Sequence, residues 1–513
     1  MPRGAAWRCA VRAPRGMIAV GPVSVASAEW ERQLRVVIVG GGGTGCIAAL
    51  LLARAGHRVT VVERYALPVH EDVEEAAAAA FRATAPQLVH PHIIMARTGE
   101  LLRDLLPDVY AGLLEAGAVA APLHTQMPPS LPDKTPRPGD ERLTVVATRR
   151  STLDLVLLRA VTSQPGITVS RGMKVTGLLT ASAGPESAPG APPHVTGVRT
   201  DGGDLAADVV VDASGRRSAI DDWLTAIGAA KTDFRQAECG IAYYSRHYRL
   251  RQDVTPPGSP LRRMVAALDE FLVGLWPADN ATMQLALFPL AGDHRFRAAR
   301  DPGIFTRVVS TVPAYRDWLA ALDPITGVFV MGGLRNTLRR LVVSQAPVAT
   351  GLHAIGDCVC TTNPTLGRGL AFALTGAADL TSTLAKFPDD PFAQAVAMDD
   401  SVTAHIEPHY AEQAVVDGAR LRYVRHVIFG DPVTEEPPAP DRVSYAEVRT
   451  AMPYDPVAFR AFWRVMGMQG LPAEIYTEPE VIASTRKLLS TPGAVPPPVQ
   501  PTRDELESAL GFL

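Results

Sequence analysis

The chain has 513 residues, of which 47% are hydrophobic, so it is long enough to form several domain-sized units with substantial buried cores. Its formal net charge of −3, without a polybasic face or interleaved aromatic and basic residues, argues against nucleic acid as a partner. Its five cysteines include no C-x-x-C pair, which argues against a disulfide framework, a zinc site and a redox-active dithiol; a reducing cytoplasm is the expected location.

Residues 1–32 are predicted to be a disordered N-terminal extension. The first 28 of them contain four arginines and no acidic residue. An export or transit leader is the alternative interpretation, because MIAVGPVSVASA resembles a signal-peptide apolar region followed by small residues. Gly21 and Pro22 interrupt that apolar region, which favours the extension.

The segment RVVIVGGGGTGCIAALLLARAGHRVTVVER predicts the start of a βαβ unit. It contains 18 residues without a charge, Val36 to Ala53, but the five glycines inside this run weaken a continuous helix and exclude a membrane span. We expect a strand over Arg35–Val39, a glycine turn, a helix that ends near Ala55-Gly56, and a second strand over Arg58–Glu63.

The residues of this unit have separate physical roles in binding a dinucleotide. Gly40 allows the sharp turn, Gly42 lets the backbone approach a pyrophosphate, and Gly45 lets the helix pack close to the strand. The helix N-terminus offers free N–H groups and a positive dipole to the phosphates. Glu63 ends the second strand, where its carboxylate can accept the hydroxyl hydrogens of an adenosine ribose. A purely structural glycine turn is the alternative.

Two later segments have the pattern of further cofactor contacts. In ADVVVDASGRRS, an apolar strand over Val209–Val211 ends at Asp212, and Ser214-Gly215 follow in a turn. The alternative is that Asp212 only caps this turn. In GLHAIGDCVCTTNPTLGRGL, a short strand over His353–Ile355 leads to Gly356-Asp357, and a turn that contains Pro364, Gly367, Arg368 and Gly369 opens a long helix.

This second pattern predicts FAD and not a nicotinamide coenzyme as the bound group. An acid at a strand end can hold a ribityl hydroxyl, and the next helix N-terminus can stabilise the negative charge of a reduced flavin ring. Cys358 and Cys360 are expected to be small buried residues, with a reactive role as the alternative.

The chain is expected to have an α/β fold with a discontinuous, Rossmann-like FAD-binding domain over residues 33–222 and 345–388, in which 101–144 form a helical and loop insertion. Residues 223–344 show strand-like alternation, which predicts a β-sheet substrate domain. Its segment YYSRHY, from Tyr243 to Tyr248, alternates between two faces, and the sequence leaves open which face meets the substrate. Residues 389–513 are expected to form a helical, proline-punctuated C-terminal region.

Taken together, the motifs resemble flavin-dependent monooxygenases of the para-hydroxybenzoate hydroxylase type, within the wider fold shared with flavin halogenases and geranylgeranyl reductases. The motifs are GGGGTG with Glu63-Arg64, TRRSTLDLVLL, VVVDASG and IGDCVCTTNPTLGRG, and they cover about residues 35–385. The resemblance implies that Arg150 lies along FAD, that Asp357 binds the ribityl chain and that Pro364 to Gly369 face the isoalloxazine.

A closer resemblance concerns the P-Q-x-x-H-x-H element that begins at Pro86. It is similar to a branch of bacterial FAD enzymes that includes polyether epoxidases, which implies that Arg82 and His92 approach the flavin. The alternatives are a solvated arginine and a histidine of the loop.

The resemblance implies an FAD-dependent monooxygenase that uses O₂, through a flavin C4a-hydroperoxide, to hydroxylate or epoxidise a small apolar, aromatic or alkene substrate. NADPH or NADH is the implied electron donor, and a separate flavin reductase is an alternative source. Asp212-Ala213-Ser214-Gly215 departs from the usual Asp-Gly and is closer to the halogenase and reductase branches. The rival is a reductase or dehydrogenase of the geranylgeranyl-reductase type; a halogenase is disfavoured because no Trp-x-Trp-x-Ile-Pro motif is present. No metal ligand and no dedicated catalytic side chain are nominated.

Overall fold

The computed structural model describes residues 32–512, except 67, 83–84, 182–190, 263 and 434–438. The predicted N-terminal extension lies outside the described residues apart from Arg32, whose guanidinium donates a 2.9 Å hydrogen bond to Asp389. Within the described residues, no helix has both the length and the apolar character that a bilayer crossing requires.

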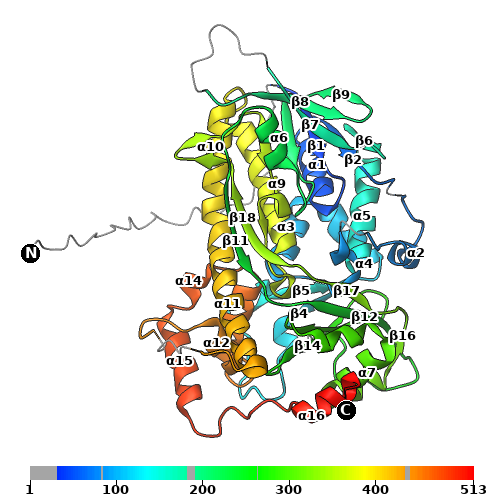
Figure 1. Cartoon of the computed structure of the whole chain (residues 1–513), viewed down its shortest axis with the longest axis vertical. Coiled ribbons are helices and arrows are strands. Elements are labelled where there is room, and N and C mark those ends of the chain that lie inside the picture. Colours follow the sequence, from blue (N-terminus) through cyan, green and yellow to red (C-terminus); the bar gives the residue numbers. More distant parts are fainter. Residues whose placement is uncertain are drawn as a thin grey trace, which may run out of the picture.

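A five-stranded parallel sheet forms the first layer of the fold, as the sequence predicts (Figure 1). Its strand order is β21 (Leu352–Ala354), β10 (Val209–Asp212), β1 (Arg35–Val39), β2 (Arg58–Glu63) and β6 (Ile167–Arg171). β1 and β2 have the bounds expected from the sequence, and they pair in parallel with Val37 opposite Thr60. Because the chain leaves this sheet after β10 and returns at β21, distant segments bring their carboxyl ends to one edge, where ligands bind in folds of this kind.

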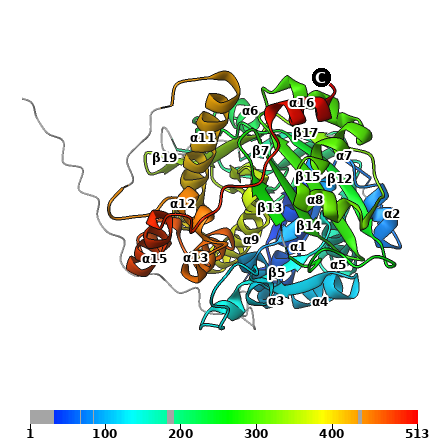
Figure 2. The ribbon, with the colours of Figure 1, turned by 90° about the horizontal axis from the view of Figure 1, so that it is seen from below.

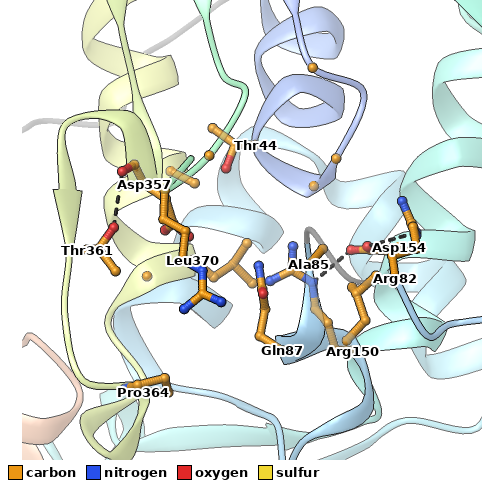
Figure 3. A pocket seen from close by; sticks show the side chains of 18 of the residues that line it. Thr44, Arg82, Ala85, Gln87, Arg150, Asp154, Asp357, Thr361, Pro364 and Leu370 are labelled. Atoms are coloured by element: carbon orange, nitrogen blue, oxygen red, sulfur yellow. Dashed lines mark hydrogen bonds and ion pairs between the residues drawn. The ribbon is translucent and has the colours of Figure 1, made fainter. Parts of the chain in front are cut away.

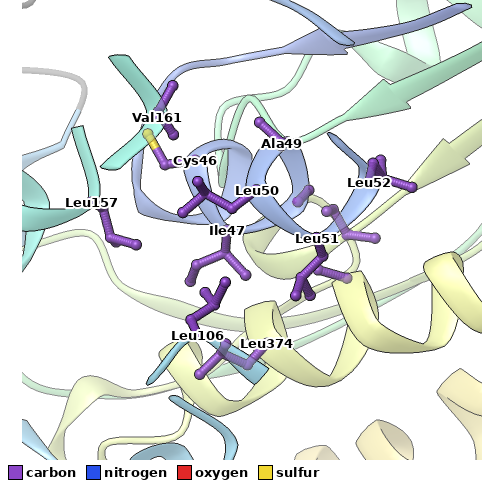
Figure 4. Close-up of a cluster of buried hydrophobic side chains, with 14 of the residues drawn as sticks. Cys46, Ile47, Ala49, Leu50, Leu51, Leu52, Leu106, Leu157, Val161 and Leu374 are labelled. Carbon is purple, nitrogen blue, oxygen red and sulfur yellow. The ribbon is translucent and has the colours of Figure 1, made fainter. Parts of the chain in front are cut away.

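Helix α1 (Gly43–Arg54) lies between α5 (Arg150–Ser163) and α9 (Gly369–Lys386) and fills the core beside the sheet (Figure 4). Its fully buried residues include Ile47, Ala48, Ala49, Leu50 and Leu52. Burial of each leucine or isoleucine contributes about 1.5–3 kcal/mol. The helix is therefore held firmly against the sheet, and its N-terminus has a defined place.

Two three-stranded antiparallel sheets and several helices accompany the parallel sheet. One sheet contains β3 (Ile93–Ile94), β5 (Thr144–Ala147) and β4 (Val119–Pro122), and the other contains β7 (Val175–Thr180), β8 (Val195–Thr200) and β9 (Gly203–Ala206). The accompanying helices are α2 (Val73–Ala78), α3 (Ala96–Leu105), α4 (Pro107–Glu115) and α6 (Ile220–Ala226). Of these, α4 lies inside the segment predicted as a helical insertion, and α3 begins before it.

An antiparallel sheet forms where the sequence shows strand-like alternation, and it lies below the parallel sheet in Figure 1. Its order is β13 (Met264–Ala267), β14 (Phe271–Pro277), β15 (Thr282–Pro289), β12 (Tyr243–Leu250) and β16 (Leu322–Pro324), and β17 (Phe329–Met331) also pairs with β12. Tyr244 and Tyr248 pack in a hydrophobic cluster with residues of α7 (Pro302–Ser310) and α8 (Pro313–Leu319). Tyr243 and Ser245 point to the opposite face, because Ser245 Oγ lies 2.7 Å from His90 Nδ1.

A buried ion pair joins the two layers. Arg149 donates from Nε and Nη2 to Asp279 Oδ2 at 2.9 and 2.6 Å, and Thr152 donates to the same oxygen at 3.0 Å. Asp279 follows β14 and is fully buried, and Arg149 also pairs with Glu74 of α2 at 2.8 Å. Because buried charges need satisfied hydrogen bonds, this cluster fixes the start of α5 against the antiparallel sheet.

Helix α11 (Glu407–Phe429) runs beside two paired strands, β11 (Asp233–Glu238) and β18 (Arg335–Arg340) (Figure 1). β18 also pairs with β22 (Cys360–Thr361), and β19 (Val342–Val343) pairs with β20 (Ala346–Pro347). The C-terminal region is helical, as predicted, with α10 (Pro391–Ser401), α12 (Tyr445–Ala451), α13 (Pro456–Met466), α14 (Pro472–Ile475), α15 (Pro479–Ser490) and α16 (Arg503–Leu510). Figure 2 shows α16 beside α7, where Arg307 Nε donates to the carbonyl of Ala509 at 3.2 Å.

Candidate cofactor and substrate site

The glycine turn between β1 and α1 combines two tightly packed glycines with one that faces open space. Gly40 has a φ of +103°, and a Cβ there would lie 2.7 Å from the carbonyl oxygen of Ala213. A Cβ on Gly45 would lie 1.8 Å from the carbonyl oxygen of Gly40. A Cβ on Gly42 would meet no atom within 4 Å, because this glycine borders a large cavity. These are the environments that the sequence predicts for a turn, a close helix contact and a ligand approach.

Glu63 lies at the cavity edge, where β2 ends. Its two carboxylate oxygens accept backbone hydrogen bonds from Gly41 at 2.7 Å and Tyr65 at 2.9 Å, and the residue is buried. Each oxygen keeps a further lone pair, so the held carboxylate can still accept hydrogen bonds from a ribose. Arg64 also borders the cavity, and α1 begins beside them without a side-chain cap.

The cavity is continuous from the glycine turn to the start of α9 (Figure 3). Thr44 of α1 and Asp357, in the short 3-10 turn Gly356–Cys358, both line it. The Asp357 carboxylate has no hydrogen bond or ion pair to any described residue. Burial raises its pKa, and the charges of Arg150 and Arg216 oppose that shift. A half-buried carboxylate that borders the cavity and has no partner among the described residues fits the predicted role of holding a ribityl hydroxyl.

The predicted turn before α9 borders the cavity, and Pro364, Gly367 and Gly369 are among its lining residues. Gly367 has a φ of +70°, and α9 begins without a side-chain cap, so its first N–H groups remain available. Arg368 also borders the cavity, but its guanidinium points into the protein: Nη1 donates to the carbonyl of His409 at 2.7 Å, and Nη2 pairs with Glu412.

Arg150, Arg82 and Asp154 form a charged cluster on the other side of the cavity in Figure 3. Arg150 Nε donates to Asp154 Oδ1 at 2.7 Å, and Arg82 Nη2 lies 4.0 Å from Asp154 Oδ2. A Cβ on Gly43 would lie 2.4 Å from Arg150 Nη2, so this guanidinium lies across the glycine turn. Asp154 was not predicted from the sequence, although its position four residues after Arg150 places both on one helix face.

Three of the predicted cofactor residues do not border the cavity. These are Gly45, Asp212 and Gly356. The fully buried Asp212 accepts hydrogen bonds from Ser214 N at 3.0 Å and Ser214 Oγ at 2.6 Å, and from Ser218. Its contacts are those of the turn-capping alternative, and the turn it shapes brings Ser214 and Gly215 to the cavity. Gly356 has a φ of +63°, and a Cβ there would lie 2.7 Å from Thr44 Cγ2.

The cysteines next to this site have structural contacts. Cys358 and Cys360 are both buried, and Cys358 Sγ accepts a hydrogen bond from Gly215 N at 3.1 Å. Burial raises the pKa of both thiols. Thiols that stay protonated and inaccessible are unreactive, which supports the predicted buried role.

A further cation, Arg216, was missed by the sequence analysis. It follows Gly215, borders the cavity, and has no carboxylate within ion-pair distance in the described part of the chain. Its buried Nε also lacks a partner among those residues. Burial lowers its pKa, and Arg217 adds to this effect while Asp357 opposes it. A cation without a counter-ion in a cavity wall is a place for an anionic ligand.

The antiparallel sheet and the residues after it line their part of the cavity with uncharged side chains, namely Tyr243, Trp276, Phe288, Met331 and Leu334. Phe288 packs edge-on against Tyr243 at 4.6 Å and against Trp276 at 5.7 Å between ring centroids.

His90 and His92 of the P-Q-x-x-H-x-H element also border the cavity. Burial, the dominant cause, lowers both pKa values to about 3, so both rings are neutral near pH 7. Arg82 and His92 both border the cavity.

The residues present fit FAD. The open face of Gly42 and the uncapped start of α1 suit a pyrophosphate, Glu63 suits a ribose, and the unpaired Asp357 suits a ribityl chain. Arg216 supplies an unpaired positive charge beside the same cavity. The uncapped start of α9 suits an electron-rich ring.

Comparison with known proteins agrees with this assignment. A family model described as FAD dependent oxidoreductase matches residues 35–124. The curated protein Rv3254 of Mycobacterium tuberculosis is 26% identical over 380 residues, which cover 68% of this chain and 72% of that protein.

Solved structures share the fold at low sequence identity. PqsL, a probable FAD-dependent monooxygenase from Pseudomonas aeruginosa, is 16% identical with a TM-score of 0.56, over 78% of this chain and 100% of that one. The flavin-dependent brominase Bmp2 is 16% identical with a TM-score of 0.56, over 89% of this chain and 98% of that one. The family match and the site geometry together confirm the predicted FAD-dependent oxidoreductase and leave its reaction open.

Proposed function

We propose that this FAD-dependent oxidoreductase is a monooxygenase that transfers one oxygen atom from O₂ to a neutral aromatic ring or alkene. The observation that carries the proposal is the continuity of one cavity from the dinucleotide turn to the uncharged, aromatic wall of the antiparallel sheet. In this view, residues 33–222 and 345–388 hold the cofactor, and residues 223–344 hold the substrate.

Bound FAD supplies the electron transfer and the oxygen activation, and the protein supplies position, charge and exclusion of water. The uncapped N-terminus of α9 directs its dipole into the cavity, where it stabilises negative charge. Leu370 and Phe288 are buried at the cavity wall and keep water away from the reacting atoms.

Among the described residues on the substrate side, we infer no dedicated acid–base pair. His90 and His92 are neutral because burial lowers their pKa values, and the Tyr243 hydroxyl donates to Asn363 Oδ1 at 2.9 Å. An uncharged wall also favours a neutral substrate, because a carboxylate placed against it would lose its hydration without gaining a cation. This uncharged lining suits an oxygen transfer that relies on the cofactor and not on a dedicated side-chain acid or base.

NADPH or NADH, or a separate flavin reductase, is the proposed source of electrons. We also propose a cytoplasmic location. The four described cysteines, Cys46, Cys239, Cys358 and Cys360, are all free thiols, which agrees with a reducing compartment.

The proposal is tested by the oxygen dependence of product formation. FAD-loaded protein is incubated with NADPH, NADH or a chemical reductant and with neutral probes such as 1-naphthol, indole and styrene, in air and in matched anaerobic vessels. A monooxygenase forms a product that has gained oxygen only in air, and without a probe the reduced protein releases hydrogen peroxide. A reduced or desaturated product that forms equally well without O₂ would establish the reductase alternative.

A further inference from the structure

Asn363 connects the turn in front of α9 with three other segments. Its Oδ1 accepts hydrogen bonds from the Tyr243 hydroxyl at 2.9 Å and from Thr365 N at 3.2 Å. Its backbone N–H donates to Asn336 Oδ1 at 2.7 Å, and its Nδ2 donates to Asp417 Oδ1 at 2.9 Å. Asn363 is buried and immediately precedes Pro364, which borders the cavity.

Among the described residues, Asp417 is the only charged member of this hydrogen-bonded group. It lies on α11, is 5% exposed, and accepts from three amide groups: Asn363 Nδ2 at 2.9 Å, Asn336 Nδ2 at 2.7 Å and Gln413 Nε2 at 3.0 Å. An ionised carboxylate can only accept hydrogen bonds, so every amide around it must turn its NH₂ group inward. The Oδ1 of Asn363 must then face Tyr243 and Thr365.

We propose that Asp417 is a positioning residue, whose carboxylate fixes the orientation of the Asn363 amide and thereby holds both the turn at residues 364–367 and the hydroxyl hydrogen of Tyr243. The inference rests on the proposed function in one respect, namely that this turn faces the bound flavin. It extends the proposed function because Asp417, on α11, does not itself border the cavity but acts on it through Asn363.

The protonation state of Asp417 decides how strongly its carboxyl group orients the three amides around it. Burial raises its pKa to about 6, and the three amides and Arg368 oppose that shift. The other titratable group that contacts it is the buried thiol of Cys239, whose pKa is itself raised by burial and by Asp417. A proton on Asp417 removes its negative charge and places an O–H donor among the three NH₂ groups, which weakens its hold on them. Asp417 therefore orients the amide of Asn363 more strongly above about pH 6 than below it.

Asp417→Asn tests the proposal, with Asp140→Asn as the matched control. Asp140 is as buried, at 4% exposed, and accepts two 2.8 Å hydrogen bonds from Arg460, but it does not border the cavity or contact the Asn363 group. The visible absorption spectrum of bound FAD is recorded from pH 4.5 to 8. We expect a spectral transition with a midpoint near pH 6 in the wild type and in Asp140→Asn, and its loss in Asp417→Asn.

Asn363→Ala is the second variant, because it separates the turn from Asp417 without removing the carboxylate. It should also lose the spectral transition. The proposal is overturned if Asp417→Asn or Asn363→Ala keeps the wild-type transition, or if the wild type binds FAD and shows none. A lowered melting temperature with an unchanged spectrum would mean that Asp417 is merely structural.

Failure of FAD binding would contradict the proposed function but would leave the role of Asp417 testable in the flavin-free protein. The pKa of this carboxyl is raised above its value in the unfolded chain. Its stabilising contribution is therefore present below about pH 4 and is lost as the pH rises through about 6. The difference in melting temperature between the wild type and Asp417→Asn should change over that interval, and a constant difference would refute the assignment.

Discussion

Gly42→Val and Gly45→Ala should separate cofactor binding from folding, although the two glycines lie three residues apart. A Cβ at Gly42 meets no protein atom within 4 Å, and its φ of −73° suits any residue. The free energy of unfolding of the flavin-free Gly42→Val variant should therefore lie within about 0.5 kcal/mol of the wild-type value. The valine side chain would occupy the place of the pyrophosphate. Losing one hydrogen bond to a charged group costs about 1.5–3 kcal/mol, so FAD should bind about 10–150-fold more weakly.

Gly45→Ala should show the opposite pattern. Its Cβ would lie 1.8 Å from the carbonyl oxygen of Gly40, which forces the helix away from the strand. Overpacking of this kind costs about 1–3 kcal/mol or more, so the flavin-free protein should be destabilised. Chemical denaturation measures stability, and the quenching of FAD fluorescence during titration measures affinity. Tight FAD binding by Gly42→Val, or full stability of Gly45→Ala, would refute the roles given to these glycines.

Three further substitutions test the account. Arg149→Met should lower the free energy of unfolding by about 3–5 kcal/mol, because it leaves the buried carboxylate of Asp279 without its cation; a loss below 1 kcal/mol in denaturant titration would contradict this. Asp357→Ala should weaken FAD binding by about 1.5–3 kcal/mol without lowering the melting temperature of the flavin-free protein, since this carboxylate has no partner among the described residues. Arg216→Gln should weaken FAD binding more than Arg217→Gln, although both remove one positive charge, because Arg217 is more exposed; equal losses would point to a general field effect.

The part of the fold that follows local patterns could be predicted from the sequence. The strands Arg35–Val39 and Arg58–Glu63 have the expected bounds, because an apolar run with a glycine turn and a following apolar helix permits few other structures. The same holds for α9, which begins at Gly369 after the predicted turn. In these segments, residues close in sequence determine the conformation.

Contacts between distant segments could not be predicted in the same way. Arg368 belongs to the turn expected to face the flavin, but its guanidinium finds Glu412 and a carbonyl on α11, more than 40 residues later. Asp417 shows the same limit, since its partners Asn336 and Asn363 come from two other segments. The sequence also left open which face of β12 meets the cavity. Alternation separates two faces but does not indicate that His90 packs against the face with Ser245.

The most direct test of the central claim is the isotopic composition of the product formed from a neutral aromatic or alkene probe under ¹⁸O₂. A monooxygenase with its site in this cavity should place one ¹⁸O atom in each product molecule, and the label should be absent when ¹⁸O is supplied only as water. A product without ¹⁸O from O₂, formed at the same rate in its absence, would contradict oxygen transfer by this protein.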